Sequence, residues 1–390
     1  AMNRYASIIE NSQNDGVDKE EVRKYYKMSA DQGNTDAMVN YAVLLTGETS
    51  SPEEKKEGCS YMKMAADKGN VIAMCKYGSM LKNGVGVQVD KKEAARYLKM
   101  AADNGHSGAM FNYALMLKKG NGIPANNDES VKYFKMSADN GLAVGMFKYG
   151  SMLKSGDGVA ANKEEAARYF KMAADKGDTD SMNNYGLMLY NGEGVEKDPK
   201  EACRYFKMSA DNGSKVGLYK YGCMLKEGEG IERNDEEACR YFKEAIEKGQ
   251  VDALSEYGLM VKEGRGVEQN YDDALEYFKE ASDKGSADGM YNYGLMLKNG
   301  EGIDKNESES VKYIKEAADK GQSDAMYDYA MMAKNGEGME KNETEFFKYI
   351  KMSAERGQIN AMFNYGTLLK NGQGFPENKR EACRYYKFSA

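Results

Sequence analysis

The chain has 390 residues, of which 30% are charged, and a formal net charge of −7 at pH 7. This negative balance works against a sequence-independent hold on nucleic acid, because affinity for a polynucleotide depends mainly on neutralising its phosphates. No apolar run reaches the roughly 18 residues that a membrane-spanning helix needs, and the first residues carry no apolar signal core. We therefore expect no nucleic-acid partner, no membrane contact and a cytoplasmic location.

One glycine recurs at an unbroken spacing of 36 residues. Two tyrosine ladders have the same period, one from Tyr5 to Tyr365 and one from Tyr25 to Tyr385, and each has eleven rungs. A period of this length indicates one structural unit stacked many times. We predict a single array over residues 1–390, in which each unit contacts its neighbours. The glycines are Gly33, Gly69, Gly105, Gly141, Gly177, Gly213, Gly249, Gly285, Gly321 and Gly357.

Neither end of the chain coincides with a unit boundary. Residue 1 falls three positions into a unit, and Ala390 stops three positions before the next expected glycine. We expect the array to continue beyond this sequence. The apolar faces at residues 2–9 and 381–388 are expected to promote end-to-end association, since exposed stacking faces seek partners.

Residues 106–141 represent the repeating unit. Gly108–Lys119 places apolar residues at helical spacing, which predicts a first amphipathic helix, helix A. A glycine-rich segment then ends helix A. Helix B is predicted to begin at Asn126, whose side chain caps the first turn while Glu129 reaches back to the cap. It is predicted to stop at Gly141.

The same helix-start pair recurs in ten of the eleven units, and only the unit with Glu54 departs. Isolated helices of this length are marginal in water, so each helical hairpin must bury its apolar faces against adjacent hairpins. We therefore predict an all-α solenoid of about eleven 36-residue helix-turn-helix repeats, with about 22 helices and no strand. The closing glycines, such as Gly177, are expected to be left-handed.

Sulfur-containing residues occupy recurring positions that we expect to be core. The methionines lie mostly in two positions, represented by Met80, Met116, Met152 and Met188 in helix A and by Met100, Met136 and Met172 in helix B. Four of the six cysteines share one apolar position, so we expect buried free thiols in a reducing compartment. The cysteines are Cys59, Cys203, Cys239 and Cys383 in that position, with Cys75 and Cys223 elsewhere.

Little in the chain suggests catalysis. The single histidine, His106, stands beside Gly105 and is expected to be an exposed turn residue. One histidine and scattered cysteines do not assemble a zinc site. The loops such as Gly192-Glu193-Gly194 lack the Lys-Ser/Thr of a phosphate-binding loop and follow a helix instead of a strand. We expect a protein that is not an enzyme and uses no cofactor and no metal.

The unit carries a recognisable pattern over essentially the whole chain. It reads Ala-Met-x-x-Tyr-Gly-x-Met-Leu-Lys-x-Gly-x-Gly-Val and then Glu-Ala-x-Arg-Tyr-Phe-Lys-x-Ala-Ala-Asp-x-Gly. This pattern resembles the Sel1-like repeat family, which is related to tetratricopeptide repeats. Only the loops around Asn14–Val17 and Gly47–Pro52 depart clearly, and Tyr97 stands where that family often has tryptophan. The resemblance implies a right-handed superhelix whose A helices line a concave face, and a role as an adaptor in protein complexes.

Two adjacent positions of helix A vary from unit to unit and are candidates for recognition. One, just before the first tyrosine, alternates between Asn and Lys over six units and becomes acidic at Glu256 and Asp328. The other, one residue earlier, is aromatic in six units. Amides can pair with an extended backbone, lysines attract carboxylates, and rings offer apolar contacts. The predicted peptide groove comprises Phe111, Asn112, Phe147, Lys148, Asn184, Tyr219, Lys220, Tyr291, Asn292, Tyr327, Phe363 and Asn364.

Three functions remain open for these columns. We favour a protein-interaction adaptor that holds a peptide or partner segment in the concave groove. The alternative is an enzyme or small-molecule binder in that groove, which would need a deep pocket with convergent polar groups. A passive spacer with an ordinary solvated face is the third. Lys76, Lys148 and Lys220 predict a basic first half of the groove, which would orient the acidic portion of a ligand.

Overall fold

The computed structural model describes residues 1–10 and 19–389, and these form 22 α-helices and no strand. The all-α prediction is confirmed. The departure that we predicted at Asn14–Val17 lies outside the described residues. The chain divides into two compact units, Ala1–Asp198 and Pro199–Ala390, and each is described by itself. No helix of the described residues is long and apolar enough to cross a membrane.

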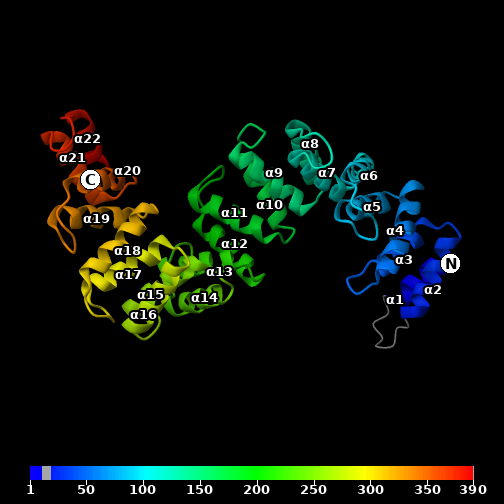
Figure 1. The fold of residues 1–390 in the computed structure, drawn as a ribbon, viewed down its shortest axis with the longest axis horizontal. Coiled ribbons are helices and arrows are strands. Elements are labelled where there is room, and N and C mark those ends of the chain that lie inside the picture. Colours follow the sequence, from blue (N-terminus) through cyan, green and yellow to red (C-terminus); the bar gives the residue numbers. More distant parts are fainter. Residues whose placement is uncertain (11–18, 390) are drawn as a thin grey trace. The chain divides into compact units, whose positions relative to one another are not determined.

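The first unit contains helices α1 to α11, coloured blue to green in Figure 1. Odd-numbered helices are the A helices of the repeat and even-numbered ones are the B helices. Their bounds are α1 Met2–Glu10, α2 Lys19–Asp31, α3 Thr35–Leu45, α4 Pro52–Asp67, α5 Val71–Asn83, α6 Lys91–Asp103, α7 Ser107–Lys119, α8 Asn127–Asp139, α9 Ala143–Ser155, α10 Lys163–Ala174 and α11 Thr179–Asn191.

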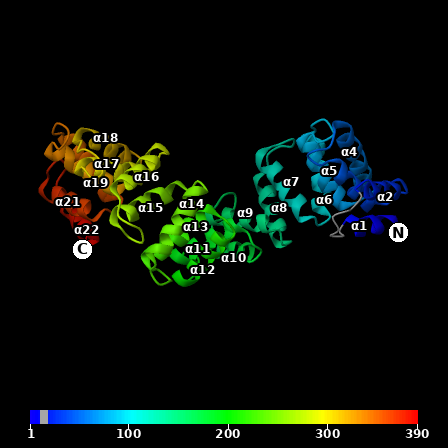
Figure 2. The same cartoon turned by 90° about the horizontal axis from the view of Figure 1, so that it is seen from below.

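The second unit contains helices α12 to α22. Within each unit every helix packs against the helices before and after it in the sequence. Helices α7 and α8, for example, lie side by side in both Figure 1 and Figure 2. The bounds are α12 Pro199–Asp211, α13 Lys215–Glu227, α14 Asp235–Glu247, α15 Val251–Glu263, α16 Tyr271–Asp283, α17 Ala287–Asn299, α18 Glu307–Asp319, α19 Ser323–Asn335, α20 Glu343–Glu355, α21 Ile359–Asn371 and α22 Lys379–Ser389.

The cap of helix B differs in one detail from the prediction. Asn126 Oδ1 accepts a hydrogen bond from the Glu129 N–H at 3.1 Å, as expected. The glutamate does not reach the Asn126 backbone, because that N–H donates to the Leu117 carbonyl at 3.0 Å and so closes the turn between helices A and B. Glu129 instead accepts from the Asn126 side-chain amide at 3.3 Å.

In the unit with Glu54, helix B begins at a different repeat position from the other units, but its first turn is still capped. Its helix α4 begins three residues early, after Ser51. Ser51 Oγ accepts from the Glu54 N–H at 3.2 Å, and Glu54 accepts from the Ser51 N–H at 2.8 Å. The reciprocal box that we expected in the other units is therefore complete here, where the Ser51 N–H is not used by the preceding helix.

Tyrosines join the helices within and between repeats. Tyr113 of α7 and Tyr133 of α8 form an edge-to-face pair with ring centroids 4.9 Å apart. The Tyr133 hydroxyl also donates to Asp103 of the preceding repeat at 2.7 Å. The equivalent hydroxyls of Tyr97 and Tyr169 donate to their own preceding repeats at 2.5 and 2.6 Å. These three repeats are thus each tied to the preceding repeat by a buried ring and a charge-assisted hydrogen bond.

The closing glycines are left-handed as predicted, with a φ of +91° at Gly177 and +88° at Gly105. A second set lies in the loop after helix A, where Gly122 has a φ of +84°. A Cβ at Gly122 would stand less than 3.0 Å from the backbone of Lys91 at the start of α6. This second glycine therefore lets the loop lie directly on the previous B helix.

Two expectations about the core are wrong. The A-helix methionines are buried, but Met100 and Met136 of helix B are only partly buried and Met172 is 39% exposed. They lie at the margin of the B helix, beyond the face that packs on the A helices. Cys383 has the same repeat position as the buried Cys59 but is exposed, because no later helix of the structure covers that side of α22.

Candidate functional site

Each A helix presents four positions on one side, at i, i+3, i+4 and i+7, which share a face because of helical spacing. We call these positions the A-helix face. On α7 they are only partly buried, while the intervening apolar residues Met110, Tyr113, Ala114 and Leu117 are buried. The columns predicted from the sequence are its second and third positions. On α7 the face consists of Gly108, Phe111, Asn112 and Leu115.

The phenylalanines of the first unit are half-buried rather than freely exposed. The Phe111 ring lies 5.5 Å from Phe134 of α8 in an edge-to-face arrangement. The Phe147 ring lies 5.9 Å from Phe170 of α10. Each ring therefore packs on the B helix of its own repeat and leaves one edge on the A-helix face.

The asparagines of the first unit already use part of their amide. The Asn112 Nδ2 donates to the Gly108 carbonyl at 3.0 Å, and its Oδ1 accepts from Lys82 at 3.5 Å. The Asn184 Nδ2 donates to the Asp180 carbonyl at 2.9 Å. Each side chain keeps a second N–H and acceptor capacity. Because part of the amide is already used, one hydrogen bond from the side chain to a ligand backbone is favoured over two. Lys148 is half-buried and forms no ion pair with the residues that the structure describes.

The tyrosines of the second unit link one A helix to the next. The Tyr291 hydroxyl donates to Asp328 Oδ2 at 2.8 Å, and the Asn364 amide donates to the Tyr327 hydroxyl at 3.4 Å. Burial, and then the Asp328 charge, raises the pKa of Tyr291. The sequence predicted that these groups are free to contact a ligand, whereas their hydroxyl groups are hydrogen-bonded to the next A helix.

The other predicted residues of the second unit vary in exposure. The Tyr219 ring is 6.1 Å from Phe242, and the Lys220 Nζ lies 5.1 Å from the Tyr219 ring centroid. Asn292 is half-buried. Phe363 is 57% exposed and lies one turn from Ile359, which is 62% exposed. Ile359 is the first position of the A-helix face, and it forms with Phe363 the most exposed apolar part of that face in the described residues.

The charge of the face also depends on a position that sequence reasoning missed. One turn before Glu256, Asn292 and Asp328 the second unit carries further acids, and their side chains share the face by i, i+4 spacing. Desolvation raises the pKa of Asp288; a hydrogen bond with Gln322 opposes this shift, and the charges of nearby acids add to it. Glu256 is paired with Lys226 at 2.7 Å. The added acids are Asp252, Asp288 and Asp324.

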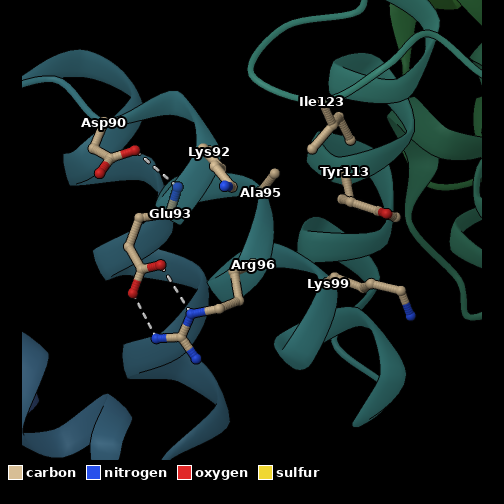
Figure 3. A pocket seen from close by; sticks show the side chains of 8 residues that line it. All are labelled: Asp90, Lys92, Glu93, Ala95, Arg96, Lys99, Tyr113 and Ile123. Atoms are coloured by element: carbon tan, nitrogen blue, oxygen red, sulfur yellow. Dashed lines mark hydrogen bonds and ion pairs between the residues drawn. The ribbon is translucent and has the colours of Figure 1, made fainter.

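The best-formed hollows of the described residues include three that no predicted groove residue lines. The first, of 480 Å³, lies between α6 and the following repeat. Figure 3 shows Glu93 holding Arg96 in it, at 2.6 and 2.9 Å, with Tyr113 and Ile123 on the opposite wall. The second has the same repeat position around Asn162 and Arg168, and the third lies beside Phe388. These open hollows lack the enclosure that a small-molecule site favours.

His106 is not simply an exposed turn residue. It is half-buried, and its Nδ1 accepts from the Ala109 N–H at 3.1 Å, which caps the start of α7. The same position caps other A helices, as Asn70 does for α5. In the described part of the chain no group of three or more His, Cys, Asp or Glu side chains could hold a metal ion.

The comparisons with known proteins agree with this geometry. The family model described as Sel1 repeat matches residues 1–34, 35–70, 71–106, 107–142, 143–178, 179–214, 216–250, 251–286, 287–322, 323–358 and 359–390. A protective antigen of uropathogenic Escherichia coli with an SLR fold is 25% identical, with 94% of this chain and 79% of that chain covered and a TM-score of 0.75. A Sel1 repeat protein from Oxalobacter formigenes is 23% identical, with 84% and 93% covered and a TM-score of 0.57. No curated protein matches the sequence.

Proposed function

The chain belongs to the Sel1 repeat family, whose members generally act as protein-interaction scaffolds, and we propose that it is a non-catalytic adaptor. In this proposal the A helices line a concave groove that holds a peptide or a segment of a partner protein. In this proposal the eleven repeats that match the family model form one array. Its free cysteines fit a reducing compartment such as the cytoplasm.

The observation that carries the proposal is the contrast between positions that recur and positions that vary. The recurring tyrosines and methionines of helix A are buried in most repeats, with Tyr5 of the first helix an exception at 47% exposed. The varying positions combine half-buried rings, such as Phe111 and Phe147, with amides and with a lysine that has no ion pair. Rings fixed by packing on one side lose little conformational entropy when a partner covers the other side, which suits them as binding anchors.

Replacing Phe111 and Phe147 together with Ala tests the proposal. We expect partner binding to weaken by more than about 1 kcal/mol, and Lys148→Glu to change mainly the salt dependence of binding. The matched control is Phe134→Leu, since Phe134 is fully buried and contacts Phe111 without lying on the face. Partners would be captured from native lysate with the intact chain, identified, and titrated against each variant.

The outcome can refute the groove directly. If Phe111→Ala/Phe147→Ala and Lys148→Glu both bind the partner as the parent chain does, recognition belongs to the B helices or the loops. If Phe134→Leu weakens binding as much as the double variant, the loss reflects stability and the rings are not anchors.

A further inference from the structure

Two A helices of the first unit carry the same apolar and basic pair, two repeats apart. On α5 the first and third positions of the face are Ile72 and Lys76, and on α9 they are Val144 and Lys148. In each pair the apolar side chain lies one helical turn before the lysine, so both project from the same side of the helix. The intervening helix α7 has Gly108 in the apolar position.

The apolar members of these pairs are exposed. Ile72 is 50% exposed and Val144 is 42% exposed. Lys76 and Lys148 form no ion pair with the described residues. This differs from the B-helix surface, where Arg96 is held by Glu93 at 2.6 Å. The face of α5 and α9 therefore presents two apolar groups and two lysines that form no ion pair, although the Lys148 charge does act on the nearby Asp157.

Side-chain contacts connect these helices through α7. The Lys82 Nζ at the end of α5 donates to Asn112 on the face of α7 at 3.5 Å. Lys118 at the end of α7 pairs with Asp157, in the loop after α9. These contacts, and the packing of each helix on the next along the chain, hold the three A helices in the same register. We call Ile72, Lys76, Gly108, Asn112, Val144 and Lys148 the basic stripe.

The basic stripe is bounded by acids on both sides. The apolar position is taken by Asp36 on α3 and by Asp180 on α11. Asp36 is already engaged by the Asn70 amide at 2.9 Å. A negatively charged ligand would be attracted by Lys76 and Lys148. It would be repelled by the aspartates on α3 and α11, since like charges brought together at an interface disfavour binding. These acids limit the favourable contact to three A helices.

We propose that the basic stripe binds an acidic, amphipathic peptide segment in an extended conformation. This inference rests on the adaptor function proposed above and names the chemistry of the partner. Side chains link α5 to α7 and α7 to the loop after α9, so consecutive A helices are neighbours in the stack; at about 10 Å between neighbouring helices, Ile72 and Val144 are separated by about 20 Å. An extended chain rises about 3.3 Å per residue, so the segment carries two apolar side chains about six residues apart. A carboxylate accompanies each of them to meet Lys76 or Lys148, and the chain between crosses Gly108, where no side chain projects.

A displayed library of random twelve-residue peptides, selected on the full chain, tests the proposal. We expect the selected peptides to be rich in Asp and Glu and to have two apolar residues about six apart. Their affinity is measured by fluorescence anisotropy. Ile72→Ser/Val144→Ser should weaken it roughly tenfold, which corresponds to the loss of two partly buried apolar contacts. Lys76→Glu/Lys148→Glu should weaken it at least as much, with a shallower dependence on salt.

Two matched controls separate the stripe from general surface effects. Val89→Ser/Met172→Ser removes two apolar side chains that are 49% and 39% exposed but lie off the A-helix face. Lys92→Glu and Lys132→Glu reverse exposed charges of the B helices α6 and α8. None of these variants should change peptide affinity by more than about twofold.

Each other outcome has a distinct meaning. Selected peptides that are neutral or basic, or that bind the stripe variants as well as the parent, overturn this inference. If they still depend on Phe111 and Phe147, the proposed groove survives. A library that yields no binder overturns this inference, whereas the proposed groove stands or falls with the partner captured from lysate. Concentration-dependent sedimentation of the chain that is lost in Ile72→Ser/Val144→Ser would show that the stripe joins two copies, and would also overturn the inference.

Discussion

Gly122→Ala should destabilise the chain more than Gly105→Ala, although the two glycines have nearly the same backbone conformation. Their φ angles are +84° and +88°, a region that costs a non-glycine residue about 1–2 kcal/mol. Both variants also gain about 0.4–1 kcal/mol because the unfolded chain loses freedom. These two effects cancel in the comparison. The difference in stability between the two variants therefore depends on the atoms that surround the added methyl group.

At Gly105 the methyl group would have no neighbour within 4 Å. At Gly122 it would lie less than 3.0 Å from the Lys91 backbone, which cannot move without shifting the start of α6. Overpacking of this kind costs about 1–3 kcal/mol, and we expect this difference in the free energy of unfolding between the two variants.

Equilibrium urea unfolding, followed by far-ultraviolet circular dichroism, measures the difference. Because repeat arrays can unfold in parts, amide hydrogen exchange in α6 provides a local readout. Gly122→Ala should accelerate exchange at the start of α6, and Gly105→Ala should not. Equal urea midpoints and equal α6 protection in the two variants would refute the argument that the loop glycine is required by its contact with the preceding repeat.

Three further predictions follow from the charges and the exposed apolar residues. Burial raises the pKa of Asp328, so the fold loses stability as pH rises from the pKa of this carboxyl in the unfolded chain through its raised pKa in the folded chain. Asp328→Asn keeps an acceptor for Tyr291 and should raise Tm at pH 7 but not at pH 3. An unchanged Tm at pH 7 would contradict this. Hydrogen bonds, first from Arg233, lower the pKa of Asp235 from 3.8 to about 2, so the carboxylate stabilises the fold above pH 3.8 and ceases to do so as pH falls towards 2. Asp235→Asn should therefore remove the loss of stability between these two pH values. An acid-unfolding curve identical to that of the parent chain would count against it. Ile8 and Phe388 are each 64% exposed, so we expect end-to-end association of the chain, and we expect Phe388→Ser to weaken it. Sedimentation that shows only monomer at all concentrations would contradict this prediction.

The sequence alone determined the repeat and its local structure. The period, the helix-start residues and the closing glycines predicted a helix at Gly108–Lys119, and α7 spans Ser107–Lys119. It could do so because helix formation, capping and left-handed glycines depend on residues within a few positions of each other. The same periodicity identified the buried tyrosines of α7 and α8 and two of the four positions of the A-helix face, but it wrongly placed Met172 in the core.

Only the tertiary structure decided how those residues are used. Asn126 could not complete its capping box because its N–H is taken by Leu117 of the other helix. The Tyr291 hydroxyl, which the sequence offered to a ligand, is bound by Asp328 of the next repeat. Helical spacing fixes the direction of a side chain from its own helix, whereas its partner 30 to 40 residues away depends on how the hairpins stack. The number of polar and aromatic groups left for a partner is therefore a property of the stack and could not be counted from the sequence.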